Sequence, residues 1–196
     1  MKFGWIAAAG LAAAMMAGGS AAQAEECSFD IEIADFEQAD IDRLYNCVND
    51  SLAEGYAKQG HEIGSVYRSW QVTATGPAAP GPHGDRFLLT YANDIAFDDY
   101  TKYATDEAFT MPVGSVLAKE SWKLSKKGKP RRGPLFIMTK VAAGEADETD
   151  NWVYAGVQPN GKVMKVKQSF CHDCHAAFAD QDSLGYPDPD VWLARN

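Results

Sequence analysis

The sequence predicts an α+β fold, mainly an antiparallel β-sheet with one helix toward the N-terminus and another toward the C-terminus. Apolar residues in the first third of the chain recur at three- and four-residue steps, which is typical of an amphipathic helix. From Asp85 onward, short segments with strand-like patterns alternate with turns rich in glycine, proline and asparagine. The chain of 196 residues is long enough for one domain with a substantial core.

The first segment, residues 1–24, is typical of an export signal. Lys2 supplies the positive charge, residues 3–17 form an apolar stretch, and small residues precede a cleavage site after Ala24. We therefore expect a periplasmic protein whose mature chain, residues 25–196, forms a single domain. An uncleaved anchor is the alternative, but the apolar stretch is short and rich in alanine and glycine for a membrane span. No span is expected after cleavage.

The net charge is −9, and removal of Lys2 with the signal makes the mature chain more acidic still. Such a charge argues against nucleic acid and against anionic membrane surfaces as partners. It is compatible with a basic redox partner protein or simply with solubility, and charge alone does not separate these two.

The predicted N-terminal helix spans residues 35–58. Its apolar face consists of Ile41, Leu44, Tyr45, Val48, Leu52 and Tyr56. Cys47 lies within this helix and Cys27 precedes it. In an oxidising compartment we expect a Cys27–Cys47 disulfide, which would stabilise the fold by about 3 kcal/mol. Two free buried thiols are the alternative.

The sheet is predicted from the middle of the chain onward, after a loop rich in proline and glycine at residues 76–84. A short helix is expected at residues 95–105, between the first two strands. A basic turn at residues 125–133 joins two strands, and Asn160-Gly161 is typical of a hairpin turn. The predicted strands are residues 86–92, 115–124, 134–142, 151–157 and 162–166.

The motif Cys171-His172-Asp173-Cys174-His175 has the spacing Cys-x-x-Cys-His, which indicates attachment of a c-type haem. Two intervening residues let one helical turn present both sulfurs to one porphyrin edge. His175 then becomes an axial ligand of the iron. We therefore predict one covalent haem c, held by the C-terminal helix. A thioredoxin-like redox pair and half of a zinc site are the alternatives, but neither finds its usual sequence context here.

The remaining histidines are not expected to be required for the iron. His61 ends the first predicted helix and is interpreted as a surface residue, while His83 lies in the flexible Pro/Gly-rich loop, where a solvated side chain is the default. His172 lies between the two cysteines of the motif, a position that turns it away from the iron.

The order of these features resembles the cytochrome P460 family, including its cytochrome c′-beta branch. The resemblance is carried by residues 67–70, residues 100–103 with Phe109, residues 114–120, and the Trp152 strand that leads to the haem motif. It implies a mainly antiparallel sheet with flanking helices and a homodimer. It also implies a five-coordinate iron with an open site opposite the motif histidine.

One departure from the family concerns lysine. Relatives that oxidise hydroxylamine carry a lysine cross-linked to the haem, where this chain has Ala104-Thr105. Lys102 precedes that position and is interpreted as an ordinary exposed helical lysine, while Lys119 lies in the next predicted strand. Hydroxylamine oxidation is therefore the secondary interpretation of the resemblance.

The open side of the iron is expected to bind nitric oxide or a related small nitrogen species, because Phe109, Trp122 and Phe136 could wall it with apolar groups. Met111 is the best candidate for a sixth ligand, whereas Met138 fits the core of a strand. The alternatives are a hydroxylamine-oxidising enzyme and a low-spin electron-transfer cytochrome. Catalytic residues remain unassigned.

Overall fold

The computed structural model describes residues 27–81, 83–104 and 109–194. The predicted export signal, with its cleavage site after Ala24, lies outside these residues. Within the described part of the chain, no helix has both the length and the apolar composition that a membrane span requires.

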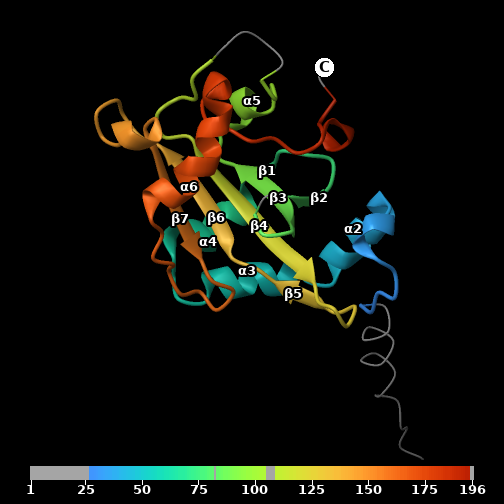
Figure 1. The fold of residues 1–196 in the computed structure, drawn as a ribbon. Helices are drawn as coiled ribbons and strands as arrows, with labels where there is room; N and C mark the ends of the chain where they lie inside the picture. Colours follow the sequence, from blue (N-terminus) through green and yellow to red (C-terminus); the bar gives the residue numbers. More distant parts are fainter. Residues whose placement is uncertain (1–26, 82, 105–108, 195–196) are drawn as a thin grey trace, which may run out of the picture.

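The described residues form one seven-stranded sheet in which every pairing is antiparallel, so the predicted α+β class is confirmed (Figure 1). The main path runs β1-β3-β4-β6-β7, with β2 pairing to β3 and β5 pairing to β4. The strands are β1 (Gln71–Val72), β2 (Ala78–Gly81), β3 (Arg86–Ala92), β4 (Val116–Leu124), β5 (Pro130–Arg132), β6 (Leu135–Lys140) and β7 (Trp152–Val157).

Four predicted strands are present with small changes at their ends, as β3, β4, β6 and β7. The fifth, residues 162–166, is wrong as a strand, because only a single bridge joins Val163 to Val157. The Met164 N–H donates to the Gly156 carbonyl as part of this bridge, and beyond it the segment runs on toward the C-terminal helix without further strand pairing among the described residues. Strands β1, β2 and β5 are too short for sequence periodicity to reveal them.

The predicted N-terminal helix is divided into α2 (Gln38–Asn46) and α3 (Asn49–Ala57). The break falls at Val48, whose φ of −128° is not helical. The predicted Cys27–Cys47 disulfide is present and ties the start of the described chain to this break. A further short helix, α4 (Glu62–Val66), follows.

Helices α2 to α4 cover one face of the sheet. Leu44, Leu52 and Tyr56 are fully buried there against strand side chains such as Phe87 and Trp122. Trp122 also stacks on Phe87, with ring centroids 6.2 Å apart. This large cluster is the main core of the protein.

The opposite face of the sheet carries α5 (Phe97–Tyr100) and α6 (Gln168–His175), as Figure 1 shows. Helix α5 is shorter than the predicted 95–105: it ends at Tyr100 with Thr101 as its C-cap, and the left-handed backbone of Tyr103 and Ala104 prevents a helix from resuming there. A second buried cluster fills this face and includes Tyr100, Met138 and Trp152. The short 3-10 helices are η1 (Ile33–Asp35), η2 (Tyr67–Ser69), η3 (Asp147–Thr149), η4 (Ala176–Gln181) and η5 (Pro189–Val191).

Candidate haem site

Helix α6 is attached to the sheet by the side chain of its first residue. Gln168 accepts a hydrogen bond from the Tyr154 N–H at 2.7 Å and donates one to the Tyr154 carbonyl at 2.8 Å. Strand β7 is the last strand of the sheet path, so its outer edge offers free backbone groups, and an amide side chain can pair with both. This contact sets where the helix begins relative to the sheet.

The two motif cysteines lie one helical turn apart on α6, and neither forms a disulfide. Residues three apart in a helix lie on the same side of it. Cys171 packs against the second cluster, and burial, together with the nearby Cys174, raises the pKa of its thiol. Cys174 is exposed. Both thiols are therefore available to one group bound beside the helix.

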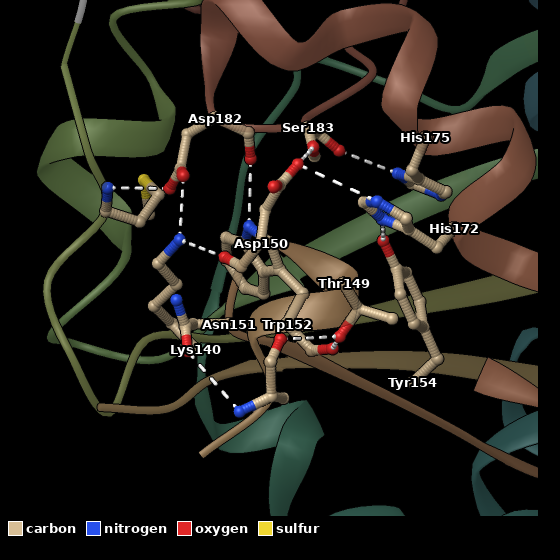
Figure 2. Close-up of polar contacts among 12 residues, drawn as sticks. Lys140, Thr149, Asp150, Asn151, Trp152, Tyr154, His172, His175, Asp182 and Ser183 are labelled. Atoms are coloured by element: carbon tan, nitrogen blue, oxygen red, sulfur yellow. Dashed lines mark hydrogen bonds and ion pairs between the residues drawn. The ribbon is translucent and has the colours of Figure 1, made fainter. Parts of the chain in front are cut away.

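His175, the last residue of α6, is buried, and its ring is fixed by one hydrogen bond (Figure 2). Its Nδ1 donates to the Ser183 carbonyl at 2.8 Å. Burial, with a contribution from nearby Lys119, lowers the pKa of this imidazole to about 4, so the ring is neutral at physiological pH. With the proton on Nδ1, the lone pair is on Nε2, which is the arrangement of a metal-binding histidine.

The carbonyl that fixes His175 lies in a strained turn. Both Asp182 and Ser183 have left-handed backbone conformations, with φ of 55° and 59°. Such conformations are unfavourable for residues other than glycine and persist only where the surroundings hold them. Here the Ser183 hydroxyl donates to Asp150 at 2.7 Å, and the Trp152 indole donates to the Asp182 carbonyl at 2.8 Å (Figure 2).

A buried ion pair completes this support. The Lys140 ammonium contacts the Asp182 carboxylate at 2.7 Å and donates to the Asp150 carbonyl at 2.8 Å. Only 6% of the lysine side chain and 9% of the aspartate side chain are exposed. The other carboxylate oxygen accepts from the Met111 N–H at 2.9 Å. We call Lys140, Asp150, Asp182 and Ser183 the His175 support; sequence analysis identified none of them.

His172 contacts the same region from the surface. Its Nε2 lies 3.8 Å from the Asp150 carboxylate, and its Nδ1 lies 3.4 Å from the Tyr154 hydroxyl. Figure 2 shows its ring directed toward these two partners. One of its two contacts is thus with Asp150, a member of the His175 support.

The sheet face near His175 carries a buried lysine. Lys119 on β4 pairs in register with Phe136 on β6, and it is 8% exposed. Its ammonium lies 3.4 Å from the Gly185 carbonyl, and burial lowers its pKa to about 8. By contrast, Lys102 forms a surface ion pair with Asp99. Of Lys102 and Lys119, it is therefore Lys119 that lies beside the candidate site.

The interpretation of His83 as a solvated loop residue is wrong. It is half-buried between β2 and β3, where its ring packs on Phe136 with centroids 5.0 Å apart. Its ring centroid lies 6.2 Å from that of His175. Burial, together with nearby Lys119 and His175, lowers its pKa to about 3. The sequence did not reveal this, because β2, which positions His83, lies in a segment whose proline and glycine content predicts a loop.

The structure also places the other residues that the sequence suggested for the open side of the iron, opposite His175. Trp122 lies in the main core on the opposite face of the sheet, so its expected role as a wall of this site is wrong. Met111 and Met138 are buried in the second cluster, where they pack against its other members. Phe109 packs at the edge of that cluster. His61 caps α4, where its Nδ1 accepts from the Gly64 N–H at 3.1 Å.

The model of the Cytochrome P460 family matches residues 65–184, which is more than half of the chain and includes Cys171, Cys174, His175 and the His175 support. The chain belongs to the cytochrome P460 family. A comparison with curated proteins finds no match.

Membership of the cytochrome P460 family implies that the protein binds haem, and the side chains present suit that group. The donors are two thiols on one helical turn and a neutral imidazole whose second nitrogen is free. The apolar wall that a haem requires is supplied by Phe136, a half-buried aromatic side chain on the sheet face. The haem supplies an iron that can bind a small ligand or exchange an electron; the chain supplies its position and surroundings.

Proposed function

We propose that this chain is an exported mono-haem c-type cytochrome whose iron binds or processes nitric oxide or a related small nitrogen species. One haem is attached through Cys171 and Cys174, with His175 as an axial ligand. The observation that carries the proposal is the His175 hydrogen bond to the Ser183 carbonyl, next to two free thiols one turn apart. That bond leaves a neutral Nε2 for the iron in the helix that carries both thiols.

The ligand class follows from the sheet face. Phe136 provides an apolar aromatic surface, and the buried Lys119, its partner on the neighbouring strand, has a pKa lowered to about 8. An apolar surface favours small neutral ligands and gives little stabilisation to the charge that develops on bound dioxygen. Nitric oxide satisfies these conditions.

Production of the full chain in a bacterium that attaches c-type haem tests the proposal. We expect periplasmic protein whose mass exceeds that of the mature chain by one haem, and whose haem resists acid–acetone extraction. The ferrous protein should bind nitric oxide. Cys171→Ser and Cys174→Ser should each lose one thioether bond, whereas Ser169→Ala on the same helix should retain both. Haem that is extracted freely would refute the covalent site.

A second candidate, hydroxylamine oxidation, is favoured by Lys119. A buried lysine whose pKa is lowered to about 8 is partly neutral near physiological pH, and a neutral amine is nucleophilic. Relatives that oxidise hydroxylamine carry a lysine–haem cross-link. Forming one at Lys119, which lies on the sheet face of the site, would replace a porphyrin C–H bond by a C–N bond and release two protons and two electrons, which a peroxide would accept. Peptide mass spectrometry would reveal a haem joined to the Lys119 peptide, and Lys119→Met should abolish both that adduct and the oxidation.

A further inference from the structure

We infer that His83 is the second axial ligand of the resting haem, opposite His175, so that a small ligand binds only after His83 leaves. This inference rests on the proposed haem site and deepens it, because it states what occupies the second axial position at rest. It also replaces the open position that the family resemblance implies with one that a side chain of this chain occupies.

The separation of the two rings is the first argument. Their centroids lie 6.2 Å apart and their planes are inclined by 65°. Two metal–imidazole bonds of about 2 Å each place the centres of the two rings roughly 6–6.5 Å apart. A distal histidine that only donates a hydrogen bond to a bound diatomic ligand needs space for that ligand, which adds roughly 2 Å or more. The observed separation therefore fits one iron between the rings.

The second argument is an unpaired nitrogen. The Nδ1 atom of His83 is buried and has no hydrogen-bond partner among the described residues. Buried polar atoms are nearly always paired, so an exception calls for an explanation. An imidazole nitrogen without a proton has a lone pair to offer a metal, and an iron ligand is the explanation that also accounts for the nearby His175.

The third argument is that the surrounding structure orients His83. Strand β2 pairs with β3, and the connection between them is tight: the Asp85 N–H donates to the Gly81 carbonyl at 3.2 Å. Gly84 has a φ of 76°, a conformation suited to glycine, and it carries the chain back toward β3. Phe136 supports the ring from the sheet.

The rival ligands are less well placed. Met111 and Met138 are enclosed in the second cluster. Lys119 lies on the same sheet face, but its ammonium has an acceptor in the Gly185 carbonyl at 3.4 Å. His83, by contrast, has its ring next to that of His175, with 6.2 Å between the two centroids.

A spectroscopic comparison of holoproteins tests the inference. Wild-type ferric protein should give a six-coordinate low-spin absorption spectrum and an electron paramagnetic resonance signal of two histidine ligands. His83→Ala should convert it to high spin, and added imidazole should restore the low-spin spectrum if the variant is folded. His61→Ala is the matched control, because His61 caps α4 instead of contacting His175, and it should match wild type. A high-spin wild type, or a low-spin His83→Ala protein without imidazole, would overturn the inference.

Binding kinetics give a second measurement. In the ferrous wild type, the rate of carbon monoxide binding should reach a plateau as ligand concentration rises, because His83 must dissociate first. In His83→Ala the rate should increase in proportion to concentration. A proportional rate in both proteins would refute the role of His83 and leave the proposed haem function intact. Failure of the proposed function would appear separately, as protein without covalent haem.

Discussion

We expect Lys140→Met to destabilise the protein by about 3–5 kcal/mol, because it leaves a buried carboxylate without its cation. The Lys140 and Asp182 side chains are both more than nine-tenths buried, and their charged atoms are 2.7 Å apart. Methionine removes the ammonium and the hydrogen bond to the Asp150 carbonyl while filling a similar volume. The remaining partner of Asp182 is the Met111 N–H, at 2.9 Å, which cannot neutralise its charge.

Urea unfolding of the holoprotein, followed by tryptophan fluorescence, measures this loss. Lys162→Met is the matched control, because Lys162 is exposed, and its free energy of unfolding should change by less than about 0.5 kcal/mol. The double variant Lys140→Met/Asp182→Asn should be more stable than the sum of the single losses implies, since it removes the unpaired charge. A loss below about 1 kcal/mol for Lys140→Met would refute the view that this pair holds the turn.

The same variant should change the haem spectrum, because the pair supports the carbonyl that binds His175. Asp182 and Ser183 are adjacent in one left-handed turn. If that turn relaxes, the Ser183 carbonyl no longer fixes the imidazole. A spectrum identical to wild type in a protein destabilised by several kcal/mol would restrict the role of the pair to stability.

Three further outcomes are expected. Replacement of Cys27 and Cys47 by serine should lower the free energy of unfolding by about 3 kcal/mol, measured in urea against the oxidised wild type. Burial lowers the pKa of Lys119 to about 8, so the unfolded chain binds more protons above that pH. The free energy of unfolding of the wild type should therefore rise relative to that of Lys119→Met between pH 8 and pH 10.5, the ordinary lysine pKa. A difference between the two proteins that does not change with pH would contradict this. Gln168→Ala should cost about 1–3 kcal/mol, because it leaves two Tyr154 backbone groups unpaired, and Gln168→Glu should lose only the donated bond.

The four long strands were predictable because their pattern is local. Each of β3, β4, β6 and β7 spans six or more residues, which is enough for apolar and β-branched side chains to mark a segment. β2 and β5 contain prolines and have at most four residues. Their strand conformation depends on partners elsewhere in the chain, β3 and β4. The break between α2 and α3 was likewise hidden, since the apolar spacing continues across Val48.

The sequence alone predicts the chemistry of haem attachment, because Cys171, Cys174 and His175 lie within five consecutive residues and their spacing has a chemical reason. It also predicted the Cys27–Cys47 pair, since few cysteines and an export signal leave few choices. The surroundings of His175 were decided only by the tertiary structure. Lys119 and His83 reach it from β4 and the β2–β3 turn, and the Ser183 carbonyl is held by residues of other segments. Side chains that meet across a sheet leave no spacing in the sequence, because their separation along the chain is set by loops and strand pairings rather than by a helical or strand period.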